Sequence, residues 1–135
     1  MTRAIGIDYG DSRVGIALSD PMRIIAKPLD TLTNNDDLIN NIKNIINEYE
    51  VSELVVGYPI GMKGQRTKQT EKVEIFVNIL EDEFPQKISV VDERLSSVSA
   101  TESLIMQGIK TGHNKEKIDS TSAAIILQEF LDSKR

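Results

Sequence analysis

The sequence predicts an α/β protein with a mixed five-stranded sheet that carries helices on both faces. Three observations support this fold class. Before residue 33, three apolar runs follow one another with only short turns between them, which indicates an antiparallel meander. After it, short apolar runs alternate with amphipathic helical patterns, which is typical of parallel strands joined by helical crossovers. The 135 residues contain no repeat or linker, so a single domain over 1–135 is expected.

The first part of the chain is expected to form the meander. Residues 3–8 and 14–18 are short apolar runs joined by Gly-Asp-Ser at residues 10–12. This is turn chemistry, because glycine accepts positive φ and the Asp and Ser side chains can bond the turn backbone. A third strand is predicted over 23–31. Pro28 within it cannot donate a hydrogen bond to a neighbouring strand, so this strand is placed at the edge of the sheet.

The first helix is predicted from apolar residues that recur at helical spacing, namely Leu38, Ile39, Ile42, Ile45, Ile46 and Tyr49. Its cap is expected at Thr33 or Asn34, with Asp36 and Asp37 in the first turn.

Alternating strands and helices are expected in the remainder. A buried strand is predicted over 53–57, and a glycine-containing loop follows over 60–66. A second amphipathic helix ends at Pro85, and a strand over 88–91 runs towards Glu93. Residues 99–102 have the spacing of a capping box and open a short helix that ends before Gly108. A loop over 109–116 and a last helix that begins near Lys117 complete the prediction.

Composition excludes several classes of protein. The chain has no cysteine, which excludes disulfides and thiolate metal sites. Its single histidine, His113, excludes a histidine-rich metal site and argues against a Ser-His-Asp triad. Neither glycine-containing segment is followed by Lys-Ser or Lys-Thr, so a P-loop is excluded. No apolar run approaches the about 20 residues of a membrane span, and no signal-peptide pattern opens the chain, so a cytoplasmic protein without a membrane partner is expected.

Three acidic residues are candidates for one shared site. Asp8 and Glu93 lie at the carboxyl ends of two predicted strands, where the functional crevice of an open α/β sheet forms. Asp119 heads the apolar stripe of the last helix and is therefore expected to face inward. Two alternatives are open: an ion pair with Arg13 for Asp8, and a helix-capping role for Asp119.

Carboxylates without nitrogen or sulfur ligands suit Mg²⁺ or Mn²⁺, because these ions prefer oxygen ligands. Two such ions can activate a water and stabilise the leaving oxygen in phosphodiester hydrolysis. Asp8, Glu93 and Asp119 are therefore the candidate catalytic and metal-binding residues.

Basic residues gather beside the acidic motifs, although the net charge of −5 argues mildly against a nucleic-acid-binding protein. The alternative for each basic cluster is a solvated loop, but the position next to the acidic motifs favours contacts with a nucleic-acid backbone. The candidate nucleic-acid-binding residues are Arg13, Lys63, Arg66, Lys68, Arg94, Lys110, Lys115 and Lys117.

Four segments together resemble the YqgF/RuvX family of pre-16S rRNA nucleases, which are also described as Holliday-junction resolvases. They are 6–20, which begins Gly-Ile-Asp-Tyr-Gly and ends Ser-Asp; 55–64, with Val-Val-Gly-Tyr-Pro and Met-Lys-Gly; 92–96, Asp-Glu-Arg-Leu-Ser; and 119–128, which begins Asp-Ser-Thr-Ser-Ala. The resemblance covers nearly the whole chain in the right order. It implies an RNase H-like fold and a cytoplasmic metal-dependent nuclease that matures the 5′ end of 16S rRNA. It also implies an acidic site on Asp8, Glu93 and Asp119.

The loop after residue 59 departs from the family pattern. Family members often have Asn-Met-Asp-Gly where this chain has Gly-Met-Lys-Gly at 61–64, and Gly-Pro-Arg where it has Thr-Lys-Gln at 67–69. An arginine usual on the next helix is matched by Glu74. We therefore expect Arg66 and Lys68 to take over the phosphate contacts of this loop.

Other functions are compatible with the same sequence. The substrate can be junction DNA instead of RNA, or the protein can be a non-catalytic module that binds rRNA or a ribosome-assembly protein. A nucleotide-binding ATPase of the actin, Hsp70 and sugar-kinase type has a similar phosphate-binding hairpin, but it needs two such domains. The expected partners are pre-16S rRNA or another structured nucleic acid, together with ribosome-assembly proteins, and the expected state is a monomer or a weak homodimer.

Overall fold

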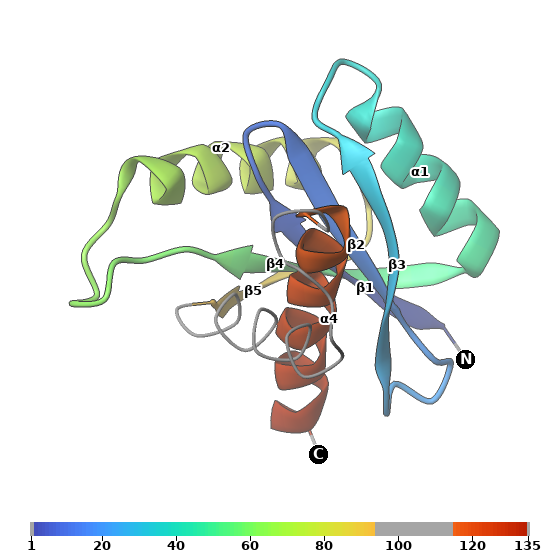
Figure 1. Cartoon of the computed structure of the whole chain (residues 1–135). Helices are drawn as coiled ribbons and strands as arrows, with labels where there is room; N and C mark the ends of the chain where they lie inside the picture. The colour runs from blue at the N-terminus through green and yellow to red at the C-terminus, as the bar shows by residue number, and fades with distance from the viewer. Residues whose placement is uncertain (1, 94–114, 135) are drawn as a thin grey trace.

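A computed structural model describes residues 2–93 and 115–134, which form a five-stranded sheet with the order β3-β2-β1-β4-β5 (Figure 1). The strands are β1 (Arg3–Tyr9), β2 (Arg13–Ser19), β3 (Ala26–Thr33), β4 (Val51–Tyr58) and β5 (Lys87–Asp92). The helices are α1 (Leu38–Tyr49), α2 (Lys68–Glu83) and α4 (Lys115–Ser133). The first three strands pair antiparallel, whereas β4 runs parallel to both β1 and β5. The predicted mixed five-stranded sheet is therefore confirmed.

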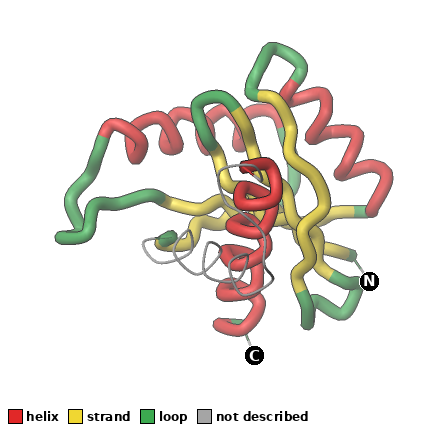
Figure 2. The backbone as a smooth tube through the Cα atoms, in the orientation of Figure 1, coloured by secondary structure: helices red, strands yellow, loops and turns green. Residues whose placement is uncertain are grey.

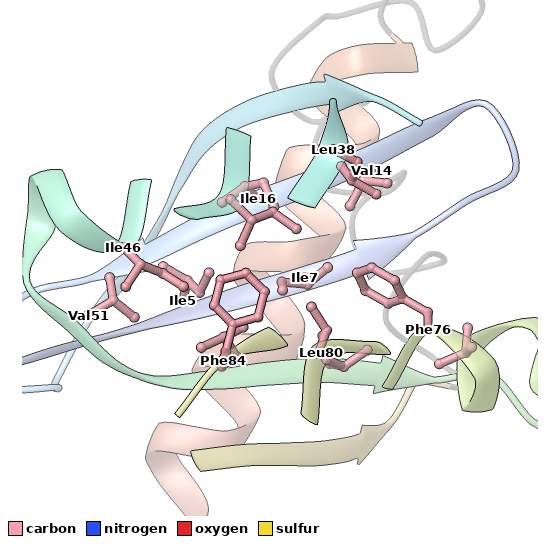
Figure 3. Packing of buried hydrophobic residues seen from close by; sticks show 14 residues of the cluster. Ile5, Ile7, Val14, Ile16, Leu38, Ile46, Val51, Phe76, Leu80 and Phe84 are labelled. Carbon is pink, nitrogen blue, oxygen red and sulfur yellow. The ribbon is translucent and has the colours of Figure 1, made fainter. Parts of the chain in front are cut away.

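Helices cover both faces of the sheet, as predicted (Figure 2). Ile5 and Ile7 of β1 belong to the core that α1 and α2 close (Figure 3). Ala4, directly before Ile5 in β1, belongs instead to a second core that α4 closes. Side chains alternate between the two faces of a strand, so each inner strand is apolar on both sides.

Small residues on the second face let α4 lie directly on the sheet. A Cβ atom on Gly6 would lie 2.6 Å from the carbonyl oxygen of Ala123, and one on Gly15 would lie 2.0 Å from that of Asp119. No real side chain fits at either distance, so glycine is required at both positions. The close packing fixes the backbone of Asp119 over β2.

The third strand begins later than predicted, at Ala26 instead of residue 23. A carboxylate oxygen of Asp20 accepts hydrogen bonds from the backbone N–H groups of Ile24 (2.7 Å) and Ile25 (2.9 Å). These bonds hold residues 21–25 in a turn, because a short acidic side chain competes well for nearby backbone donors. The predicted edge position of the strand, which contains Pro28, is confirmed.

The predicted cap of the first helix is wrong. Thr33 is the last residue of β3, and the side-chain amide of Asn34 donates to the carbonyl oxygen of Gly10 at 2.8 Å. Asn34 therefore ties the tip of the β1–β2 hairpin to the end of β3. The N-cap of α1 is Asp37, which makes no side-chain capping bond, so Asp36 and Asp37 precede the helix instead of lying in its first turn.

The structure also gives the starts of the other two helices. The sequence left the start of the second helix open, and Lys68 is the first residue of α2, because Thr67 and Thr70 form a capping box there. Helix α4 begins at Lys115 instead of near Lys117, which makes Asp119 its fifth residue. The predicted short helix before Gly108 and most of the loop after it lie outside the described residues. None of the helices in the described part of the chain is long and apolar enough to cross a membrane.

Candidate active site

Two of the predicted acids meet at the carboxyl ends of the parallel strands. Asp8 lies near the end of β1 and follows Ala4 and Gly6 on the face that α4 covers. Glu93 comes directly after β5, and its backbone N–H donates to the carbonyl oxygen of Tyr58 at 3.3 Å. The two carboxyl groups form a side-chain hydrogen bond.

Gly57 makes this contact possible, because β4 lies between β1 and β5. A Cβ atom on Gly57 would lie 2.2 Å from Oε2 of Glu93 and 2.6 Å from a methyl carbon of Ile126. The Glu93 side chain therefore crosses β4 at the one position that has no side chain. The sequence predicts Gly57 only as the end of a strand. A glycine next to a buried apolar run also signals a close approach of another segment, and Gly57 carries that signal.

Burial and mutual repulsion hold one proton between the two carboxyl groups. Burial raises the pKa of Asp8 to about 6, the hydrogen bond from Glu93 opposes that rise, and the charge of Asp119 adds to it. The pKa of Glu93 is raised to about 8, mainly by burial and in addition by the charge and the hydrogen bond of Asp8. The proton therefore stays on Glu93, which donates to the Asp8 carboxylate near neutral pH.

Asp119 lies near this pair, and its carboxylate forms an ion pair with Arg13. Nε of Arg13 donates to Oδ2 of Asp119 at 2.7 Å. The alternative of a capping role for Asp119 is wrong, because the helix begins four residues earlier. Asp119 is nevertheless close enough for its charge to raise the pKa of Asp8. Among the described residues, no group of three acidic, histidine or cysteine side chains is arranged to hold a metal ion.

Apart from Arg13, the predicted basic residues fall into three groups. Lys63 lies in the loop after β4 and Lys68 begins α2, and both are exposed, whereas Arg66 forms an ion pair with Glu74. Lys115 and Lys117 belong to the start of α4, the end of the helix that also carries Asp119. Arg94 and Lys110 lie outside the described residues.

This fold and its acidic strand ends define an RNase H-like α/β protein. Thermus thermophilus RuvC in complex with a Holliday junction substrate superposes with a TM-score of 0.58 at 9% identity, covering 99% of this chain and 96% of that one. The fowlpox virus resolvase in complex with Holliday junction DNA superposes with a TM-score of 0.61, also at 9% identity, covering 98% of this chain and 99% of that one. At this level of identity the likeness concerns the fold alone.

The particular family follows from the sequence. The model of the RuvX family, described as Holliday junction resolvase, matches residues 2–133. A protein of Ruminiclostridium cellulolyticum named "Putative pre-16S rRNA nuclease" is 43% identical over 96% of this chain and 94% of its own length. A protein of the same name from a Sulfurihydrogenibium species is 39% identical over 98% of this chain and 91% of its own length. The chain therefore belongs to the RuvX family.

Proposed function

We propose that this chain is a metal-dependent nuclease that hydrolyses phosphodiester bonds, with Asp8, Glu93 and Asp119 as its catalytic acids. The observation that carries the proposal is the hydrogen-bonded pair of half-buried carboxyl groups at the ends of β1 and β5. Such a pair is unfavourable for folding unless a cation or a proton balances it, so its presence favours a functional role. Membership of the RuvX family supports the same conclusion.

The donor set fits Mg²⁺ or Mn²⁺. It consists of carboxylate oxygens alone, and a divalent cation between Asp8 and Glu93 would replace the proton that they share. Asp119 would join them once its ion pair with Arg13 opens. When bound, such ions activate a water molecule and stabilise the leaving oxygen.

The chain's own residues would then orient the reacting groups. The attacking water would lose one proton as it bonds to phosphorus, the bond from phosphorus to the leaving oxygen would break, and that oxygen would take up one proton. Lys63 and Lys68, together with Arg13 after it leaves Asp119, would hold neighbouring phosphates. Such backbone contacts fix the register of the strand without reading its sequence.

We favour the precursor of 16S rRNA as substrate. Several proteins that are similar to this chain over nearly their whole length carry the name pre-16S rRNA nuclease. Junction DNA is the second candidate, because the family description is Holliday junction resolvase. In this proposal the protein acts in the cytoplasm, as a monomer or a weak homodimer, where ribosome-assembly proteins are its candidate partners.

A cleavage assay with matched substrates tests the proposal. Purified wild type and Asp8→Asn are incubated with a 5′-extended 16S rRNA fragment and with a four-way DNA junction, in Mn²⁺, Mg²⁺ or EDTA. We expect metal-dependent cleavage of the RNA by wild type and none by Asp8→Asn. If only the four-way junction is cleaved, the substrate is DNA and not RNA. Tight binding without cleavage of either substrate in any metal would make the protein a binding module and overturn the nuclease proposal.

A further inference from the structure

Three side chains beside the candidate active site form one polar cluster. The hydroxyl group of Tyr58 donates to Oε2 of Glu74 at 2.9 Å. The guanidinium of Arg66 donates to the other carboxylate oxygen, Oε1. Arg66 and Tyr58 also share a hydrogen bond. Glu74 is thus held through both of its oxygens, one by a cation and one by a neutral hydroxyl.

The cluster is connected to the acidic pair through the backbone. Tyr58 is the last residue of β4 and pairs in register with Asp92 of β5. Its carbonyl oxygen accepts the N–H of Glu93. Arg66 stands directly before Thr67, the capping residue of α2, and Glu74 lies further along that helix. The cluster and the acidic pair therefore lie at the same end of β4, with the Tyr58 side chain directed towards α2 and Gly57 facing Glu93.

Arg66 is not available as a cation while Glu74 holds it. The hydrogen bond from Arg66 lowers the pKa of Glu74 most, and the hydrogen bond from Tyr58 lowers it further, so this carboxyl group stays ionised at neutral pH. The ion pair is exposed, with 60% of the Arg66 side chain open to solvent. Exposed ion pairs are weak, so a phosphate group can exchange with Glu74 at the guanidinium.

We propose that Glu74 competes with substrate phosphate for Arg66 and thereby sets the strength of backbone binding next to the active site. The inference rests on the proposed nuclease function, because it assumes that a nucleic acid occupies this end of the sheet. Tyr58 has the role of a positioning residue, since it keeps the Glu74 carboxylate next to Arg66. Lys63 and Lys68 lack such a partner among the described residues and remain open to phosphate.

This competition has a signature in the salt dependence of binding. A cation that binds a phosphate releases a counterion, and each contact to a single strand adds about 0.7 to the slope of log affinity against log salt. In the wild type, Arg66 exchanges the Glu74 carboxylate for a phosphate. The released Glu74 carboxylate then takes up a cation from the salt. The net release is near zero, so Arg66 adds nothing to the wild-type slope. Without the Glu74 charge, Arg66 contributes like any other basic side chain.

Fluorescence anisotropy with a labelled single-stranded RNA in EDTA measures this slope without cleavage. We expect Glu74→Gln to bind more tightly than wild type at low salt and to steepen the slope by about 0.7. The ratio of the RNA affinity of Glu74→Gln to that of wild type then falls by about 2.6-fold for each fourfold rise in salt concentration. Arg66→Ala should keep the wild-type slope, and the double variant Glu74→Gln, Arg66→Ala should return to the value of Arg66→Ala.

Two controls separate the competition from a general change of charge. Glu81→Gln removes the same charge from the exposed end of α2 and should leave the slope unchanged. Glu74→Ala repeats the test if the glutamine side chain still holds Arg66, and thermal melts verify folding. A wild-type slope in both Glu74 variants would overturn the inference, as would a slope reduced by about 0.7 in Arg66→Ala alone. Cleavage in Mn²⁺ is scored separately, so an active nuclease without the slope change refutes only the role of Glu74.

Discussion

The guanidinium of Arg13 and the carboxylate of Asp119 form an ion pair of 2.7 Å between β2 and α4. The pair holds the third acid of the site against a cation, while the other two acids share a proton. One proton and one guanidinium therefore offset two of the three negative charges that these acids can carry, and a divalent cation can replace both groups. Opening of the ion pair would free the Asp119 carboxylate to bind a metal ion and the Arg13 guanidinium to bind a phosphate.

We predict that Asp119→Asn loses activity steeply, while its stability in EDTA changes by no more than about 1 kcal/mol. The amide removes a charge that repels Asp8, but it also leaves Arg13 without the ion pair, and these two effects oppose each other. Asparagine binds a divalent cation poorly because it carries no charge. Thermal melts in EDTA and cleavage assays in Mn²⁺ on one preparation measure both quantities.

Arg13→Gln is the matched control for Asp119→Asn, because it breaks the same ion pair and keeps the carboxylate. Calorimetry with Mn²⁺ and no nucleic acid should show weaker metal binding for Asp119→Asn and unchanged or tighter binding for Arg13→Gln. A fully active Asp119→Asn enzyme would leave Asp8 and Glu93 as a catalytic pair.

The acidic pair makes the metal-free protein less stable as the pH rises. Burial raises the folded-state pKa of Asp8 from 3.8 to about 6 and that of Glu93 from 4.5 to about 8. Protonated carboxyls are favoured in the folded state, so their contribution to stability is complete below about pH 4 and is lost as the pH rises to about 8. In EDTA, the melting temperature of wild type should therefore fall relative to that of Asp8→Asn across this range.

The comparison with Asp8→Asn isolates the pair, because every other titrating group is common to both proteins. Asp36→Asn, at an exposed position before α1, should follow wild type at each pH. Addition of Mn²⁺ at pH 8 should raise the melting temperature of wild type more than that of Asp8→Asn. Parallel pH profiles of wild type and Asp8→Asn would show that the two carboxyl groups do not interact.

Gly57→Ala should separate Glu93 from Asp8. The new methyl group would occupy the path of the Glu93 side chain and would also press on Ile126, so either Glu93 or α4 has to move. We expect a loss of about 1–3 kcal/mol in stability and much weaker Mn²⁺ binding. Gly61→Ala is the matched control, since the three atoms nearest to its methyl group all belong to the end of the flexible Gln65 side chain. Equal Mn²⁺ affinity in wild type and Gly57→Ala would refute this role of Gly57.

The sequence alone was enough to predict the sheet, its mixed strand directions and the positions of Asp8 and Glu93, because apolar periodicity and strand ends follow from local patterns. It did not predict the helix starts, where short-range competition decides. Asn34, for example, bonds the β1–β2 hairpin instead of capping α1. The pairings of Arg13 with Asp119 and of Arg66 with Glu74 were missed for another reason. They join residues from separate elements, and no local pattern in the sequence encodes which acid a given arginine contacts.

The two exposed lysines that follow β4 provide the remaining test of the nucleic-acid surface. Lys63 lies in the loop after β4 and Lys68 begins α2, and both are exposed. If each contacts one phosphate of a single strand, the variant Lys63→Ala, Lys68→Ala should flatten the salt slope of RNA binding by about 1.4. Lys27→Ala removes one exposed positive charge from the edge strand β3, outside the loop, and as a control it should keep the wild-type slope. Because backbone contacts carry no sequence information, the affinity of the double lysine variant should fall equally for unrelated RNA sequences. An unchanged slope in that variant would remove the loop from the interface and leave the start of α4 as the basic surface to test.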